Sequence, residues 1–193
     1  MGWSAAALSN IPSLRRQVIN IRRWEPSDAP KIARLFHETV RTVNLQDYSW
    51  AQVQAWAPDD YLDCRDWAQV QADRFTVVAE TKKNNDGCVL VGFAELETHN
   101  GHIDCFYCHK DYQRMGVGRK LYSALEEEAR LHNHKQLLVE ASITAKPFFE
   151  QMGFSVTTPQ TVTCRGQSFL NYQMIKSLNN SNQHNNTRTE DNG

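Results

Sequence analysis

Two neighbouring motifs between residues 104 and 120 contain side chains that could do chemistry, and they imply different kinds of site. Residues 105–109 read Cys-Phe-Tyr-Cys-His, the C-x-x-C-H spacing that attaches a c-type haem. Residues 113–118 read Gln-Arg-Met-Gly-Val-Gly, a polar, glycine-containing loop of the kind that wraps a phosphate group. The two motifs leave a haem protein, a metal or redox protein, and a nucleotide-type binder to be distinguished.

The strand context of the C-x-x-C-H motif argues against haem or metal binding. Residues 102–110 have a strand-like composition, so Cys105 and Cys108, three positions apart, would point to opposite faces of a sheet. The sequence has no second Cys/His pair at metal-ligand spacing. We therefore predict neither haem nor a bound metal at this motif.

The cellular setting points the same way. A c-type haem is attached outside the cytoplasm, but the first 17 residues have no early positive charge and only a weak apolar stretch before their arginines. We expect a cytoplasmic protein whose five cysteines are free thiols.

The loop at 113–118 gains significance from its place between a predicted strand and a predicted helix. It is not a dinucleotide fingerprint, because Leu121 stands at the third glycine position, and it lacks the Gly-Lys-Ser/Thr ending of a Walker loop. Glycines let a ligand approach the backbone closely, and the free N–H groups and dipole of a helix start favour a pyrophosphate. Arg114, Arg119 and Lys120 could add charged contacts. The alternative is an ordinary strand-to-helix turn.

The overall composition excludes several function classes. The chain has 193 residues, 40% hydrophobic and 22% charged, with a formal net charge of −1. This suits one globular domain, without the global field that recruits nucleic acid or an anionic membrane. No apolar run approaches membrane-spanning length. We expect no nucleic-acid and no membrane partner.

Hydrophobic periodicity predicts a mixed α/β sheet with helices on its faces. We expect a flexible lead-in over 1–18, one domain over 19–176 and a disordered polar tail over 177–193. Ser27 is the expected N-cap of the first helix. The expected strands are 18–24, 74–81, 88–98, 102–110, 136–142, 154–164 and 167–176, and the expected helices are 25–44, 48–58, 60–73, 116–133 and 144–154.

At the glycine loop the chain resembles the GNAT superfamily of acyl-CoA-dependent N-acetyltransferases. Gln113, Gly116 and Gly118 fill the family signature R/Q-x-x-G-x-G/A, and the resemblance extends from Ile19 to Lys176. It implies a GNAT-type mixed, mostly antiparallel central sheet flanked by helices on both faces.

Further segments support and limit this resemblance. The segment 148–154, Phe-Phe-Glu-Gln-Met-Gly-Phe, is similar to the family's F-Y-E-x-x-G-F element, and the tryptophan-bearing segment 48–58 resembles the YafP-like branch. The chain departs from the family at Lys110, where proline is frequent, and at Phe149, where tyrosine is usual.

The resemblance implies acetyl-CoA as co-substrate and the primary amine of a small molecule or peptide as acceptor, which attacks the thioester directly. Carried over by position, the cofactor-binding residues form three groups. They are Phe106, Tyr107 and Cys108 along the pantetheine arm; Gln113, Arg114, Met115, Gly116, Val117, Gly118 and Arg119 around the pyrophosphate; and Ser142 and Phe148 on the other side.

The catalytic candidates are carboxylates and tyrosines. Asp104 matches a frequent acidic position of the family, and burial beside an apolar strand would suit a base; the alternative is that it caps the preceding hairpin. Glu140 is the second candidate base, and Glu95 the third, unless these carboxylates are exposed or paired with arginine. Tyr172 is the candidate general acid, with Tyr107 as a substitute.

Several alternatives stay open at this point. Cys108 could carry the acyl group, although direct transfer is the family norm. The missing tyrosine at Phe149 leaves room for a catalytically weak CoA-binding regulatory or interaction module. Trp50, Trp56 and Trp67 could line an acceptor pocket or only pack the helices. The sequence leaves the oligomeric state open, a dimer included.

Overall fold

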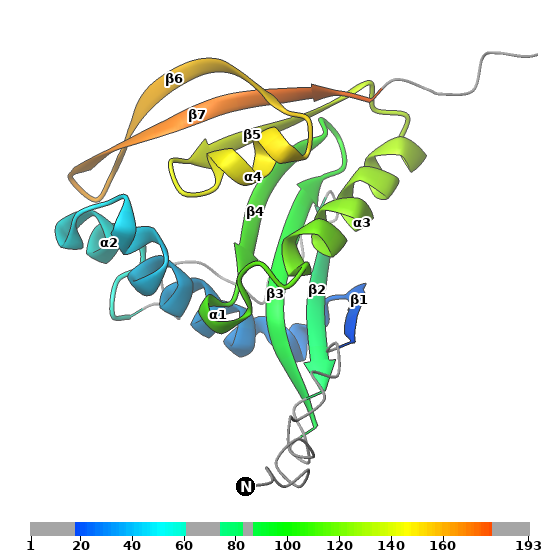
Figure 1. Cartoon of the computed structure of the whole chain (residues 1–193), viewed down its shortest axis with the longest axis horizontal. Coiled ribbons are helices and arrows are strands. Elements are labelled where there is room, and N and C mark those ends of the chain that lie inside the picture. Colours follow the sequence, from blue (N-terminus) through cyan, green and yellow to red (C-terminus); the bar gives the residue numbers. More distant parts are fainter. Residues whose placement is uncertain (1–17, 61–73, 83–86, 179–193) are drawn as a thin grey trace, which may run out of the picture.

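The computed structural model describes residues 18–60, 74–82 and 87–178. Within these residues, seven strands form one sheet in the order β1-β2-β3-β4-β5-β7-β6 (Figure 1). Of these described strands, only β4 and β5 pair in parallel, and all other neighbours are antiparallel, which confirms a mixed, mostly antiparallel sheet. The strands are β1 (Ile19–Arg23), β2 (Arg74–Lys82), β3 (Cys88–Glu97), β4 (His102–Cys108), β5 (Gln136–Ser142), β6 (Ser155–Cys164) and β7 (Gln167–Ser177).

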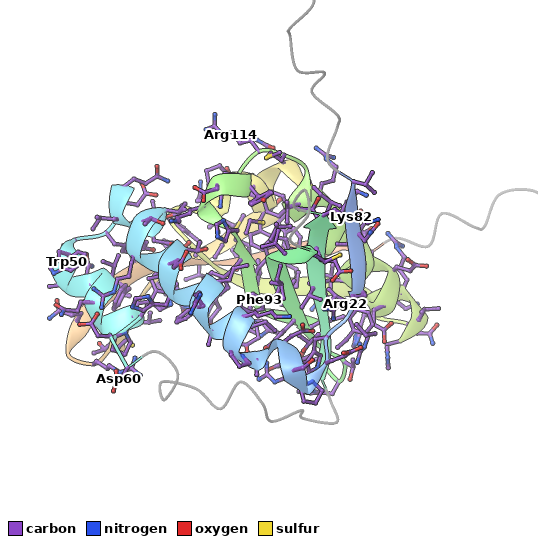
Figure 2. The ribbon with its side chains drawn as sticks, turned by 90° about the horizontal axis from the view of Figure 1, so that it is seen from below. Arg22, Trp50, Asp60, Lys82, Phe93 and Arg114 are labelled. Atoms are coloured by element: carbon purple, nitrogen blue, oxygen red, sulfur yellow. The ribbon has the colours of Figure 1, made fainter. Side chains whose placement is uncertain are left out.

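Helices cover both faces of this sheet, as expected. One core joins the sheet to α3 (Val117–Leu131) and α4 (Lys146–Gln151), and a second joins it to α1 (Ala29–Thr42) and α2 (Trp50–Trp56). We call these sides of the sheet the α3–α4 face and the α1–α2 face. Figure 2 shows Phe93 at the centre of the sheet, where its side chain belongs to the α1–α2 core.

The sequence pattern of α3 explains why it lies on the sheet. Val117, Leu121, Leu125 and Ala129 recur every four residues and are all buried, which is the apolar stripe of an amphipathic helix. This stripe fixes which side of α3 faces the sheet, and the short segment from His109 to Gly116 joins the end of β4 to the first turn of α3.

The start of the first helix differs from our expectation. Ser27 does not cap it, because the chain first makes a 3-10 turn, η1 (Pro26–Asp28), and α1 begins at Ala29. The buried Asp28 carboxylate accepts a hydrogen bond from the Glu25 amide and pairs with the guanidinium of Arg22. This ion pair holds the 3-10 turn in place, so α1 begins after Ser27. The expected helix over 60–73, with Trp67, falls almost entirely outside the described residues.

Tyr48 joins the early helices to the C-terminal half of the sheet. Its hydroxyl accepts a hydrogen bond of 2.9 Å from the Ile143 amide and donates one of 2.8 Å to the Leu170 carbonyl. The side-chain amide of Gln52 also donates to the Ser168 carbonyl at 2.6 Å. The β6–β7 hairpin therefore stays beside α2 (Figure 1).

The last strand ends just beyond Lys176. β7 ends at Ser177, and Leu178 is buried while its amide donates to the Lys135 carbonyl at 2.7 Å. Residues 177 and 178 therefore pack with the sheet. Within the described ranges, no helix combines the length and apolar character needed to cross a membrane.

Candidate active site

The parallel neighbours β4 and β5 pair at one end only and then diverge (Figure 1). Their register contains His102 opposite Leu138 and Ile103 opposite Val139, and no further pair among the described residues. Beyond this point β4 continues to pair with β3, and β5 with β7. The facing edges of β4 and β5 can therefore hydrogen-bond an extended ligand through their backbone groups.

Asp104 lies where this divergence begins. In the β3–β4 ladder Glu95 is opposite Cys105 and Leu96 is opposite Ile103, so Asp104 is the extra residue of a β-bulge. Its side chain is 33% exposed, so the burial that we expected for a base was wrong. The bulge nevertheless places a carboxylate directly after the last β4–β5 pair.

Three carboxylates surround the guanidinium of Arg74, the first residue of β2. Its Nη1 contacts Glu95 Oε2 at 3.3 Å and also contacts Asp104 Oδ2, while Nη2 lies 3.1 Å from Glu97 Oε1. Strand alternation places Arg74, Glu95 and Glu97 on the α1–α2 face. The guanidinium thus joins carboxylates of β3 and β4.

The same cluster contains a donor set that could hold a metal ion. Glu95, Asp104 and Cys105 each offer one ligand atom, and these atoms lie within 4.8 Å of one another. Arg74 already supplies positive charge to both of these carboxylates. Both carboxylates of the donor set are thus paired with Arg74.

The glycine loop lies at the far end of β4 and leads into α3. The Gln113 side-chain amide donates to the Cys108 carbonyl at 2.7 Å, which fastens the loop to the strand. Gly116 adopts a left-handed conformation with φ of 87° and precedes Val117, the first residue of α3. No side chain of the described residues caps this helix start, so its amides can serve an anion.

Side chains of the loop divide into anchored and outward-pointing groups. Val117 is buried in the core, whereas Met115 is 48% exposed and Arg119 is also exposed. Arg114 is exposed and points away from the molecule (Figure 2). Lys120 donates to the Ile19 carbonyl at 2.7 Å and so is directed to β1 rather than to the loop.

On the α3–α4 face, Gly118 of α3 lies close to side chains of α4 and β4. A Cβ atom on Gly118 would lie 3.1 Å from Phe148 Cε2 and 3.6 Å from Cys108 Sγ. The Phe148 ring also lies 5.1 Å from the ring of Phe106. Glycine at 118 therefore lets α3, α4 and β4 meet at the place where the cofactor arm is expected.

The Cys108 thiol does not suit acyl transfer. Burial raises its pKa to about 12, so the thiol stays protonated near neutral pH, and the thiolate is the reactive form. Cys105 belongs to the α1–α2 core and Cys108 packs on the α3–α4 core, which confirms that the two thiols lie on opposite faces. His109 turns away into the loop, where its Nδ1 accepts a hydrogen bond from the Asp111 amide.

The side chains of β4 that we expected along the cofactor arm lie on two different faces of the sheet. Phe106 and Cys108 pack on the α3–α4 core, but Tyr107 stacks on Phe93 at 5.4 Å and meets the edge of Phe36 at 5.1 Å on the other face. Only backbone groups of these three residues can share one ligand. Tyr107 therefore has an evident packing role.

The two remaining candidate catalytic residues lie on β5 and on its neighbour β7. Glu140 is exposed opposite Gln173, on the face away from the buried Val139 and Ala141. Tyr172 is half-buried against the α3–α4 core, with Lys146 Nζ 5.3 Å from its ring. The structure thus places Glu140 and Tyr172 on opposite faces of the sheet.

The turn after β5 is shaped by two of the expected family positions. Ser142 Oγ accepts a hydrogen bond of 3.1 Å from the Ala145 amide, which organises the entry into α4. Phe149, where the family usually has tyrosine, is 1% exposed and lies against the rings of Phe106 and Phe154. This position supplies packing and no proton donor.

A cavity of about 440 Å³ lies against the glycine loop on the side of α1. Such a volume is in the range of small-molecule sites. Sequence reasoning missed it, as it missed Arg74, because the contributing segments are far apart in the chain. The lining residues are Glu38, Val89, His109, Lys110, Asp111, Tyr112 and Met115.

The sequence is similar to known acetyltransferases over most of its length. Residues 44–176 match the family described as "Acetyltransferase (GNAT) domain". The chain is 34% identical over 156 residues to the uncharacterized N-acetyltransferase YafP of Escherichia coli K12, covering 81% of this chain and 94% of that protein.

Solved structures give the same likeness. A GCN5-related N-acetyltransferase structure from Rhodopseudomonas palustris superposes with a TM-score of 0.71 at 33% identity and covers 82% of this chain and 95% of its own. PaiA N-acetyltransferase from Thermoplasma acidophilum, in complex with coenzyme A, has a TM-score of 0.64 at 17% identity, with 83% and 99% covered. YncA of Salmonella typhimurium, solved with acetyl-CoA, has a TM-score of 0.56 at 19% identity, with 84% and 95% covered.

Proposed function

Because the chain belongs to the GNAT family of acyl-CoA-dependent N-acetyltransferases, we propose that it moves an acetyl group from acetyl-CoA to the primary amine of a small molecule or peptide. The observation that carries the proposal is the divergence of β4 from β5 immediately after Ile103 and Val139. It opens a backbone-lined path, with a carboxylate at one end and an uncapped helix start at the other.

Acetyl-CoA fits this path as an extended ligand. The pantetheine arm would hydrogen-bond to the backbone of 106–108, with Ser142 and Phe148 on the opposite side. The pyrophosphate would meet the amides of 113–119, where the α3 dipole favours negative charge. The bound coenzyme in the PaiA and YncA structures supports acetyl-CoA as the co-substrate.

Direct attack accounts for the chemistry with few protein groups. The acceptor enters as an ammonium ion, and Asp104 takes one proton, through one ordered water if it does not touch the amine. The free amine attacks the thioester carbonyl, the C–S bond breaks, and CoA leaves as a thiolate. The attacking nitrogen releases its second proton, which balances the proton that the thiolate takes up to give neutral CoA thiol and amide. Glu140 is the reserve base and Tyr172 the candidate donor to the thiolate. The raised pKa of Cys108 argues against an acetyl-enzyme.

A second candidate function rests on Phe149. Because this buried phenyl ring replaces the usual tyrosine, a CoA-binding regulatory module with little turnover is the alternative. The same site would then bind CoA without using Asp104. The four described cysteines Cys88, Cys105, Cys108 and Cys164 are free thiols, which supports a reducing compartment such as the cytoplasm for either function.

Acyl-CoA binding and amine-dependent thiol release test the proposal together. Thermal-shift titrations with acetyl-CoA and longer acyl-CoAs identify the preferred donor. A panel of polyamines, amino acids, aminoglycosides and peptide N-termini is then assayed for CoA thiol release. Reproducible release that requires an amine supports the enzyme, whereas tight binding of acetyl-CoA without release from any amine favours the regulatory module.

A further inference from the structure

We propose that Arg74 is a positioning residue for the acetyl transfer, and that it holds the Asp104 carboxylate at the point where β4 and β5 diverge. The inference rests on the proposed function, in which Asp104 is the base. Arg74 belongs to neither the glycine loop nor the cofactor path. It acts on the reaction only through Asp104.

Two glutamates of β3 hold the guanidinium of Arg74, which also contacts Asp104. Nη2 lies 3.1 Å from Glu97 Oε1, and Nη1 lies 3.3 Å from Glu95 Oε2, both on the neighbouring strand β3. The Asn100 side-chain amide donates to the other Glu97 oxygen at 2.7 Å. Because the Arg74 side chain is only 17% exposed, these contacts fix a planar fork of donors in one orientation.

The same Nη1 atom reaches Asp104 Oδ2 on β4. Asp104 is the extra residue of the bulge and lies between Ile103 and Cys105, which are both paired with β3 in the register. The ladder therefore does not set the direction of its side chain as it does for Cys105. The link from β3 through Arg74 to Asp104 supplies that direction, at the first residue after the last β4–β5 pair.

The arrangement also sets the charge around the base. Asp104 shares its surroundings with the carboxylates of Glu95 and Glu97, the Cys105 thiol 3.9 Å away, and the ring of His102, whose Nδ1 is 3.8 Å from Glu97. Arg74 offsets the repulsion among these carboxylates. Replacing Arg74 would remove the guanidinium that contacts all three carboxylates.

The first test reads the charge on Asp104 without using activity. The ¹³C resonance of its side-chain carboxyl, assigned by its loss in Asp104→Asn, is titrated in the wild type, Arg74→Met and Arg74→Lys. We expect the midpoint to rise by about one pH unit in Arg74→Met and to stay near the wild-type value in Arg74→Lys. An equal midpoint in the wild type and Arg74→Met overturns the proposal.

The second test uses the best amine found in the panel. We expect Arg74→Lys, which keeps the charge but loses the fork, to lower kcat about tenfold with the KM for acetyl-CoA unchanged. The acidic limb of its pH–rate profile should stay in place, whereas that of Arg74→Met should move to higher pH. The matched control is Arg130→Met, which removes an arginine–glutamate pair of 2.6 Å on α3 and should change neither quantity.

Two further results, a variant that does not fold and a wild type that is inactive, still leave the role of Arg74 testable. If Arg74→Met does not fold, Glu97→Gln removes the anchor of Nη2 instead, and unchanged kcat in both Glu97→Gln and Arg74→Lys would overturn the positioning role. If the wild type transfers no acetyl group to any amine, the proposed function fails, while the carboxyl titration still decides whether Arg74 holds Asp104.

Discussion

In the proposed mechanism one carboxylate, Asp104, takes the proton, and a β-bulge sets its place. Sequence reasoning placed Asp104 near the start of its strand, as the structure does. It was wrong about burial, because the pairing with Arg74 joins residues 30 positions apart, which no local pattern reveals. Glu95 shows the same limit: its need for a partner was foreseen, but the identity of the arginine was not.

Asp104→Asn tests the proposed base. We expect kcat to fall by a factor of about 10² to 10⁴, acetyl-CoA affinity to change little, and the acidic limb of the pH–rate profile to disappear. Steady-state kinetics over a range of pH, with calorimetry for acetyl-CoA, measures all three. The control is Glu127→Gln, on the exposed side of α3.

The competing role of Asp104 gives a different result. If Asp104→Asn lowers the melting temperature and leaves kcat at high pH unchanged, the carboxylate has a structural role in the hairpin. Glu140, exposed on β5, is then the next residue to test as the base.

At the scale of elements, the loop from β4 into α3 was the most predictable part of the site. Strand, glycine spacing and amphipathic helix are all local patterns, and the structure places them as expected. The junction made by Tyr48 was not predictable, because its hydroxyl joins the Ile143 amide to the Leu170 carbonyl across 95 and 122 positions. Such contacts exist only once the sheet is assembled.

Gly116→Val tests the anion site at the helix start. Gly116 has a φ of 87°, and a Cβ atom at this position would meet open space. The fold should therefore survive, while the loop shifts to relieve the backbone strain of about 1–2 kcal/mol. We expect the Kd for acetyl-CoA to rise at least about tenfold, as measured by calorimetry.

Gly166→Val is the matched control for this loop variant. Gly166 has a φ of 76° and equally open surroundings, but it lies in the turn between β6 and β7. It should show a similar loss of stability with no change in acetyl-CoA affinity. Equal affinities for wild type and Gly116→Val would mean that the cofactor binds elsewhere.

Tyr48→Phe tests the junction between the early helices and the C-terminal half of the sheet. Removing the hydroxyl leaves the Ile143 amide and the Leu170 carbonyl without this partner, so we expect the free energy of unfolding to fall by about 1–3 kcal/mol. Urea unfolding measures the change. Tyr112→Phe, on the half-exposed turn η3 (Lys110–Tyr112), is the control, and an equal effect in both variants would contradict the role of the junction.

At the scale of the whole molecule, two cores hold one sheet between them, and an ion cluster joins α3 to β7. Glu126 on α3 accepts hydrogen bonds from Arg130 at 2.6 Å and from Lys176 of β7 at 2.9 Å. Burial alone would raise the pKa of Glu126, but the bonds from Tyr122, Arg130 and Lys176 lower it to about 2. The cluster therefore stabilises the fold through the ionised carboxylate.

The pH dependence of stability follows from this lowered pKa. The contribution is complete above the ordinary glutamate value of 4.5 and is lost as the pH falls toward about 2. We expect Glu126→Gln to be less stable than the wild type at neutral pH, with the difference shrinking through this window. Urea unfolding at several pH values measures it, and a difference that stays constant with pH would contradict the assignment.

The fold class could be read from the sequence because its periodicities are local and the loop signature is specific to a family. The acceptor could not be read from the sequence, because the early helices and the β6–β7 hairpin, which we expected to determine it, meet only in three dimensions. Trp50 illustrates this: it is 57% exposed beside Arg41, whereas Trp56 packs on Tyr48 and Phe169. Similar residues in one helix thus have different surroundings.

The most direct test of the central claim follows the acetyl group itself. The protein is incubated with acetyl-CoA labelled in the acetyl group and with the best amine, and mass spectrometry measures the labelled amide and the labelled protein over time. We predict a labelled N-acetyl product formed in equal amount to free CoA, only when amine is present, with no acetylated protein intermediate. Bound acetyl-CoA that yields no labelled product with any amine, while the label stays on CoA, would contradict the claim.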